Sequence, residues 1–243
     1  MANRPQFLLL PGMMMNGRMW ADQLALLRGL GDCTVAQLGG ADAVPAIARQ
    51  VLDAAPARFH AIGFSLGAIV ALELWRQAPE RFESLVLMGF SPLADAPDRA
   101  PARRRQMARA AAGELAELVR AELAPAYFAA SADRAAAGIA TVVRMAQELG
   151  SDVFARQSTA QLGRADSRND LARITVPTLV LCGEQDRLVE PAAHRAWWAM
   201  IPGARIETVA GAGHLLTLEQ PGAVDAHLSH FYRPILQTEP SPA

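Results

Sequence analysis

Short apolar runs alternate with longer amphipathic stretches along most of the chain. Such runs are typical of strands buried on both faces of a parallel sheet, and the stretches between them have the spacing of covering helices. The pattern predicts six strands, at Gln6–Leu10, Cys33–Gln37, Arg58–Phe64, Ser84–Gly89, Thr178–Cys182 and Arg205–Val209. It predicts helices at Arg18–Gly29, Ala43–Ala54, Leu66–Gln77, Pro191–Ile201 and Thr217–Phe231. An α/β fold is therefore expected.

The alternation stops between the fourth and fifth strands, where the chain becomes rich in alanine and arginine with helical periodicity. Apolar residues recur at helical spacing there, as at Leu115, Leu118, Val119 and Leu123. We expect residues 91–174 to form an inserted helical cap, residues 1–90 and 175–236 the core, and residues 237–243 a flexible tail.

Composition narrows the possible partners and cellular location. The 243 residues are 51% hydrophobic, which suits one domain with an insertion, and the net charge of −1 provides no overall field for nucleic acid or an anionic membrane. No apolar run approaches the roughly 20 residues of a membrane span, and Pro11-Gly12 interrupts the first run before signal-peptide length. Cys33 and Cys182 stand far apart, outside any CxxC pair, so a reducing, cytoplasmic location is expected.

A nucleophile motif follows the third predicted strand. Gly63-Phe64-Ser65-Leu66-Gly67 fits G-x-S-x-G and stands where that strand ends and a helix begins, which is the context the motif requires. The tight turn forces Ser65 into a strained conformation, and the glycines allow the strand and helix to approach closely. Ser65 could instead be only a helix cap, but a cap needs neither glycine. We therefore interpret Ser65 as a nucleophile.

The chain resembles the α/β-hydrolase superfamily from Phe7-Leu8-Leu9-Leu10-Pro11-Gly12 to Leu218-Glu219-Gln220-Pro221. The resemblance implies an α/β-hydrolase fold of about six mainly parallel strands, with the cap inserted after the fourth strand. It also implies a serine, an acid and a histidine in that order, which here are Ser65, Asp186 and His214. In this chemistry the histidine accepts the serine proton, and the carboxylate orients and stabilises the imidazole.

Other carboxylates and histidines remain alternatives. Glu184 and Glu190 flank Asp186, and Asp95 follows the fourth strand, so it could supply the acid from another loop. The remaining histidines are His60, His194, His227 and His230. His227 and His230 stand three apart, but without a third ligand they are expected on a solvated helix face. Neither a metal nor a cofactor is predicted.

Backbone donors and pocket residues are expected around the serine. The oxyanion hole is assigned to the N–H groups of Leu66 and Met13, although Pro11-Gly12-Met13 replaces the His-Gly more usual in the family. The proposed substrate-binding residues are Gly12, Met14, Met15, Phe90, Tyr127 and Arg156. Candidate inner residues of the cap are Met107, Tyr127, Phe128, Met145 and Phe154, with the arginines Arg144, Arg156 and Arg164. An arginine pointing inward could bind a substrate carboxylate.

These features predict a cofactor-free serine hydrolase that cleaves a small carboxylic ester or lactone through an acyl-enzyme. The cap segments and the Leu-Glu-Gln-Pro ending are similar to the small-esterase and enol-lactonase branches of the family. Carbon–carbon bond hydrolysis and acyl transfer on the same residues remain alternatives, as does a non-catalytic ligand-binding protein. A small-molecule substrate and a monomer or homodimer are expected.

Overall fold

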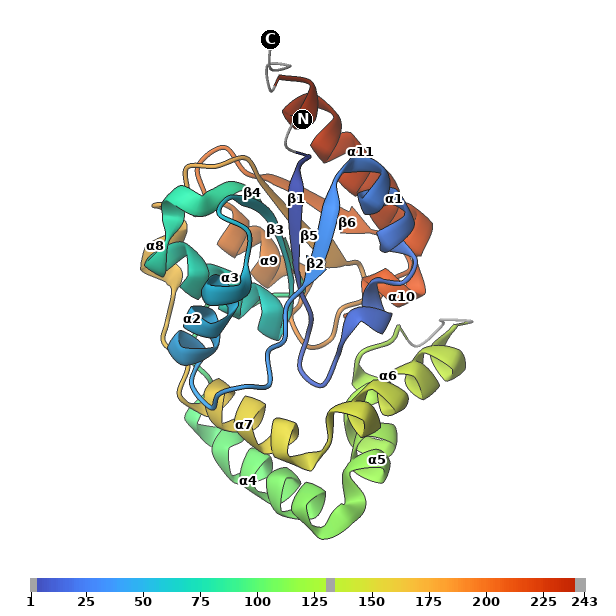
Figure 1. The fold of residues 1–243 in the computed structure, drawn as a ribbon. Coiled ribbons are helices and arrows are strands. Elements are labelled where there is room, and N and C mark those ends of the chain that lie inside the picture. The colour runs from blue at the N-terminus through green and yellow to red at the C-terminus, as the bar shows by residue number, and fades with distance from the viewer. Residues whose placement is uncertain (1–3, 130–133, 239–243) are drawn as a thin grey trace.

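The computed structural model describes residues 4–129 and 134–238 and contains one six-stranded sheet (Figure 1). The strands are β1 (Gln6–Leu10), β2 (Asp32–Val35), β3 (Phe59–Phe64), β4 (Phe82–Met88), β5 (Thr178–Gly183) and β6 (Arg205–Val209). Their order is β2-β1-β3-β4-β5-β6, and every neighbouring pair is parallel. The predicted sheet is confirmed, with strand ends that differ by at most two residues.

Helices bury both faces of the sheet. Alternate side chains of β1 point to opposite sides: Phe7 and Leu9 belong to one hydrophobic cluster, and Leu8 and Leu10 to the other. The first cluster includes side chains of α1 (Gln23–Leu30) and α11 (Pro221–Thr238). The second includes those of α2 (Val44–Ala54), α3 (Leu66–Gln77) and α9 (Pro191–Trp198). Because both faces are covered, the central strands are almost wholly apolar, as their sequences predict.

The segment after β4 is a long helical insertion that lies across the end of the sheet (Figure 1). Its α-helices are α4 (Ala100–Arg109), α5 (Leu115–Leu118), α6 (Ala135–Leu149), α7 (Ser151–Leu162) and α8 (Arg168–Leu171). The chain bends between α4 and α5 at Gly113, whose φ is 91°. Leu115, Leu118 and Val119 are buried in the same cluster as Phe7 and Leu9, so the cap and this face of the sheet share a core. The predicted helical insertion after the fourth strand is confirmed.

Two predicted helices are each divided in the structure. Residues Gly17–Trp20 form a separate 3-10 turn before α1, capped by the Asn16 side chain, which accepts a hydrogen bond from the Arg18 N–H. Near the C-terminus, α10 (Leu216–Glu219) ends before Gln220, and α11 begins at Pro221. Proline disfavours helical geometry at the preceding residue, which explains the break.

The C-terminal helix is longer than predicted. Helix α11 runs to Thr238, two residues into the segment expected as a tail, and the remainder of that segment lies outside the described residues. No helix among those described combines the length and apolar character required to cross a membrane.

Helix α3 crosses close to β1 because Gly67 has no side chain. A Cβ atom at Gly67 would lie 2.0 Å from the Leu10 carbonyl oxygen, and one at Gly63 would lie 2.7 Å from the Ala68 Cα. Both contacts are with backbone atoms, which cannot move without displacing a strand or helix. The expectation that these glycines permit close approach is therefore confirmed.

We expect Gly67→Ala to lower the free energy of unfolding by at least about 2 kcal/mol, because overpacking against fixed backbone is costly. Urea denaturation provides the measurement. Gly29→Ala is the matched control, since a Cβ there meets nothing within 4 Å and alanine favours the helix. Wild-type stability in Gly67→Ala would contradict this account.

Candidate active site

Ser65 occupies a strained turn between β3 and α3. Its backbone has φ 51° and ψ −112°, a conformation that non-glycine residues rarely adopt. The Ser65 N–H donates to the Met88 carbonyl at 2.9 Å, and the Ser65 carbonyl accepts from Ala68 and Ile69 at 3.0 and 3.1 Å. These bonds hold the turn from both sides, and the Ser65 side chain reaches a cavity beneath the cap. The strained conformation expected from the motif is confirmed.

His214 and Asp186 form a hydrogen-bonded chain with Ser65. His214 Nε2 lies 3.2 Å from Ser65 Oγ, and His214 Nδ1 lies 2.8 Å from Asp186 Oδ2. Asp186 follows β5 and His214 follows β6, so both side chains come from loops at the carboxyl edge of the sheet. The structure thus brings together three residues that are far apart in sequence.

Glycine again makes the arrangement possible. A Cβ atom at Gly89, which has φ 54°, would lie 2.9 Å from His214 Cε1. The imidazole therefore occupies space that only glycine leaves open after β4. The rings of Phe64 and Tyr127 flank the imidazole, with centroids 5.1 and 6.0 Å from it.

The Asp186 carboxylate is held in its ionised form despite burial. Burial alone would raise its pKa, but the hydrogen bond and charge interaction with His214 and bonds from the Val189 and Leu188 N–H groups lower the pKa below its ordinary value. Asp186 Oδ1 accepts those two backbone bonds at 3.0 and 2.9 Å, while Oδ2 faces His214. Each oxygen therefore has a separate task, and an ionised Asp186 can stabilise a protonated imidazole.

The alternative acids lie elsewhere. Asp95 is bound by Arg103 and Arg164 in the cap, Glu184 is exposed and accepts a bond from the Gly211 N–H, and Glu190 is exposed at the start of α9. Of these carboxylates, only that of Asp186 contacts His214.

The other histidines have structural surroundings. His60 is buried against Ser84 Oγ at 3.0 Å, and His194 is buried and accepts a hydrogen bond from the Phe90 N–H at 3.1 Å. Burial lowers the pKa of each to about 4, so both are neutral at pH 7. His227 lies 4.0 Å from Glu207. Residues 4–129 and 134–238 contain no group of three or more side chains that could hold a metal ion.

The two expected oxyanion donors have free N–H groups. Within the described part of the chain, neither the Leu66 N–H nor the Met13 N–H donates a hydrogen bond. Leu66 N begins α3, where the helix leaves its first N–H groups unpaired. Gly12 leaves room beside this loop, since a Cβ there would lie 2.8 Å from both Met15 Sδ and the Phe64 ring.

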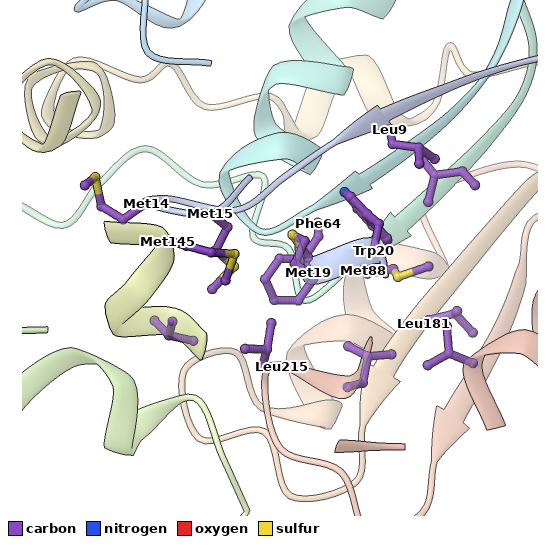
Figure 2. Close-up of a cluster of buried hydrophobic side chains, with 14 of the residues drawn as sticks. Leu9, Met14, Met15, Met19, Trp20, Phe64, Met88, Met145, Leu181 and Leu215 are labelled. Atoms are coloured by element: carbon purple, nitrogen blue, oxygen red, sulfur yellow. The ribbon is translucent and has the colours of Figure 1, made fainter. Parts of the chain in front are cut away.

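A cavity of about 420 Å³ lies between the sheet edge and the cap. Ser65 and His214 line it, as do two of the predicted substrate-binding residues, Met15 and Tyr127. Met13, predicted for its backbone N–H, also lines the cavity. From the cap, Phe154 and Arg164 also face the cavity, as anticipated. Figure 2 shows Met15 beside Met145 and close to Phe64. The loop after β1, which contains three consecutive methionines at residues 13–15, therefore packs against both the sheet and the cap.

Four of the six residues predicted for substrate binding lie outside the cavity lining: Gly12, Met14, Phe90 and Arg156. Met14 is buried in the core, and its N–H donates to Gln157 Oε1 at 2.8 Å. Phe90 is fully buried in the hydrophobic cluster that contains Leu8 and Leu10, where its ring packs against that of His194. Arg156 turns to the Gly39 carbonyl, to which its Nε donates at 2.6 Å. Among the other cap candidates, Arg144 is exposed and pairs with Glu148.

Glu219 is a residue of the site region that sequence reasoning did not single out for a role. Its buried carboxylate accepts hydrogen bonds from the Gly213 N–H at 2.8 Å and the Ala129 N–H at 2.6 Å. It therefore ties the loop that carries His214 to the cap segment that carries Tyr127. The only available signal was the Leu218-Glu219-Gln220-Pro221 motif.

We expect Glu219→Gln to lower the free energy of unfolding by about 1–3 kcal/mol and to reduce hydrolytic activity about tenfold, because an amide places N–H donors against a backbone N–H. Urea denaturation and kcat with a neutral ester provide the measurements. The control Glu184→Gln alters an exposed carboxylate on a neighbouring loop and should change stability by less than about 0.5 kcal/mol. Equal effects of the two substitutions would contradict a special role for Glu219.

Comparisons with known proteins agree with this architecture. A family model described as the alpha/beta hydrolase family matches residues 7–227. Over 234 residues the chain is 27% identical to a pimeloyl-(acyl-carrier protein) methyl ester esterase from Aeromonas salmonicida, covering 89% of this chain and 91% of that protein.

Solved structures share the fold. An esterase from Thermogutta terrifontis superposes with a TM-score of 0.86 at 23% identity, covering 96% of this chain and 91% of that one. An enol-lactonase from Burkholderia xenovorans gives 0.83 at 22% identity, covering 95% and 92%. Since the family model spans most of the chain and the structure contains the corresponding sheet and cap, this protein belongs to the alpha/beta hydrolase family.

Proposed function

We propose that the protein is a serine hydrolase that cleaves a small carboxylic ester or lactone through an acyl-enzyme. The observation that carries the proposal is the hydrogen-bonded chain from Ser65 through His214 to Asp186 at the wall of the cavity. The similarity to an esterase sequence, and to esterase and enol-lactonase structures, favours ester bonds as the target.

Ser65 would attack the carbonyl carbon while His214 Nε2 accepts the hydroxyl proton. Asp186 keeps the proton on Nδ1, so that Nε2 is free to accept, and stabilises the imidazolium that forms. Collapse of the tetrahedral intermediate transfers the proton from Nε2 to the leaving alcohol and leaves the acyl group on Ser65. A water molecule then attacks the acyl-enzyme, with His214 again acting as the base.

The unpaired N–H groups of Met13 and Leu66 are suited to the oxygen of this intermediate. Hydrogen-bond donors placed before the reaction stabilise developing negative charge without reorganisation, and one such donor is typically worth about 3–4 kcal/mol of barrier. Leu66 also begins helix α3, whose dipole adds positive potential at Ser65.

The cavity sets the size of the substrate. Its volume of about 420 Å³ is at the small end of ligand pockets, and apolar side chains such as Ile69, Leu93 and Phe154 form part of its wall. Short acyl chains and monocyclic lactones therefore fit better than long-chain lipids.

A fluorophosphonate probe tests the proposal, because it labels an activated serine covalently. We expect one label, on the peptide containing Ser65, and a burst of chromophore from a 4-nitrophenyl ester. Labelling should vanish in Ser65→Ala and persist in Ser91→Ala, which removes another serine of the same cavity. A folded wild-type protein that is neither labelled nor active on a panel of esters and lactones would overturn the proposal. Cleavage of a diketone alone would favour carbon–carbon bond hydrolysis.

A further inference from the structure

The cap side of the cavity carries an excess of positive charge. Arg99, Arg103 and Arg164 line it, and the carboxylates that line it are those of Asp95 and Glu122. Glu122 is paired with Arg109. Two of these guanidinium groups, those of Arg103 and Arg164, therefore share the single charge of Asp95. None of this positive charge is used in the proposed chemistry.

Asp95 is already held by Arg103 through both of its carboxylate oxygens. Its side chain is only 2% exposed, and its two oxygens accept hydrogen bonds from Arg103 Nε at 2.5 Å and Nη2 at 3.1 Å. Arg164 Nη2 lies 3.6 Å from Asp95 Oδ1, an ion pair beyond hydrogen-bond length. Arg99 has no ion pair within 4.0 Å among the described residues.

Two guanidinium nitrogens have no acceptor in the part of the chain that the structure describes. Arg164 uses Nε for the Leu93 carbonyl at 2.8 Å and Nη1 for Gln161, which leaves Nη2 without a hydrogen bond. Arg103 directs Nε and Nη2 to Asp95, which leaves Nη1 without one. The Arg103 and Arg164 side chains are only 16% and 12% exposed, so these donors belong to largely buried cations.

The electrostatic surroundings of Arg164 also show uncompensated positive charge. Burial lowers the pKa of Arg164; Asp95 opposes that effect, while Arg103 and Arg99 lower the pKa further by repulsion. An anion between these groups would relieve the repulsion that Asp95 leaves.

Tyr127 connects this charged wall with the candidate active site. Its ring centroid lies 6.0 Å from that of His214, and it lines the same cavity. Burial raises the pKa of Tyr127 to about 12, an effect that the nearby positive charge of Arg103 partly offsets. Because Ser65, Arg103 and Arg164 line the same cavity, one substrate bound there can contact both Ser65 and the arginines.

We propose that the natural substrate carries a carboxylate remote from its scissile bond, and that Arg103 and Arg164 bind this carboxylate. The inference rests on the proposed hydrolase function and adds the substrate class. Guanidinium groups suit a carboxylate because their planar N–H donors match its two oxygens. Fixing Asp95 alone would require one arginine, which leaves the second buried cation unexplained.

The experiment compares an acid with its uncharged isostere. Monomethyl adipate places the carboxylate on the acyl side, and 6-acetoxyhexanoate places it on the alcohol side. Each is paired with the corresponding carboxamide, and Ser65→Ala supplies the uncatalysed background. We expect kcat/KM to favour the acid at least tenfold in one of the two pairs, with a preference that falls as salt screens the charges.

The variants test which residues hold the carboxylate. In Arg103→Gln and Arg164→Gln the acid-to-amide ratio should fall at least fivefold. Arg164→Gln leaves the paired contact between Arg103 and Asp95 in place, so it tests the site even where loss of Arg103 disturbs the cap. The matched control is Arg105→Gln, an exposed arginine on the same helix α4 that does not line the cavity, and it should keep the wild-type ratio.

Failure of this inference is distinguishable from failure of the proposed function. If the esters that carry a carboxamide are hydrolysed as well as those that carry a carboxylate, with a kcat/KM ratio near one in both pairs, the carboxylate site is overturned and the hydrolase function stands. If no ester is hydrolysed, calorimetry with wild-type protein decides the binding. Selective binding of an acid that is lost in Arg164→Gln supports the site, and equal binding of acid and amide overturns it.

Discussion

Ser65→Ala is expected to lower kcat for a 4-nitrophenyl ester by about 10⁴-fold or more. The loss is large because the hydroxyl supplies the attacking atom, which no neighbouring group can replace. His214 Nε2 lies 3.2 Å from Ser65 Oγ, so the same substitution also leaves the imidazole without the proton it would accept. Steady-state and burst kinetics measure the effect.

The fold should survive this substitution. Removing one oxygen at the cavity wall opens no space in the core, and the bond from the Ser65 N–H to the Met88 carbonyl is retained by alanine. Ser91→Ala, at another position on the cavity wall, is expected to keep most of the activity. If Ser65→Ala retained more than a tenth of wild-type kcat, Ser65 would not be the nucleophile.

Asp186→Asn is expected to lower kcat about 10⁴-fold near neutral pH, through the tautomer of His214. The Leu188 and Val189 N–H groups both donate to Asp186 Oδ1, so an asparagine oxygen would occupy that position. Its amide N–H₂ would then face His214 Nδ1, which must accept rather than donate. The proton moves to Nε2, and Nε2 can no longer take the Ser65 proton.

The control for this prediction is Glu190→Gln, which neutralises an exposed carboxylate four residues away and should leave kcat unchanged. Direct NMR observation of the His214 ring nitrogens in Asp186→Asn would report the tautomer independently. An Asp186→Asn enzyme within tenfold of wild type would mean that another group orients the imidazole.

Local patterns in the sequence were sufficient for the sheet and for Ser65, and the family resemblance supplied Asp186 and His214 as candidates. Ser65 lies within a motif that specifies both its turn and its neighbours, and the positions of Asp186 and His214 after buried strands place them at one edge of a parallel sheet. The break between α10 and α11 at Gln220 could also have been predicted from the sequence, because Pro221 follows it.

The pocket was less accessible to sequence reasoning. Met13 and Met15 line the cavity whereas Met14 does not, although all three stand in one run of methionines. Met14 has a positive φ of 55° and its side chain is buried in the core. Nothing in the neighbouring sequence predicts that backbone conformation. Arg156 and Arg164 are both arginines of the inserted helical segment, yet of the two only Arg164 lines the cavity, while Arg156 binds the Gly39 carbonyl.

The sequence by itself determined the alternation of strands and helices, the position of the cap and the identity of the strained serine. Each depends on residues close together in the sequence, where the spacing of hydrophobic residues and the positions of glycines determine the local backbone structure. Only the tertiary structure decided that Asp186 rather than Asp95 contacts His214, that Glu219 joins the histidine loop to the cap, and that two buried arginines share the Asp95 carboxylate. These contacts join residues distant along the chain, and they depend on side-chain directions that packing sets.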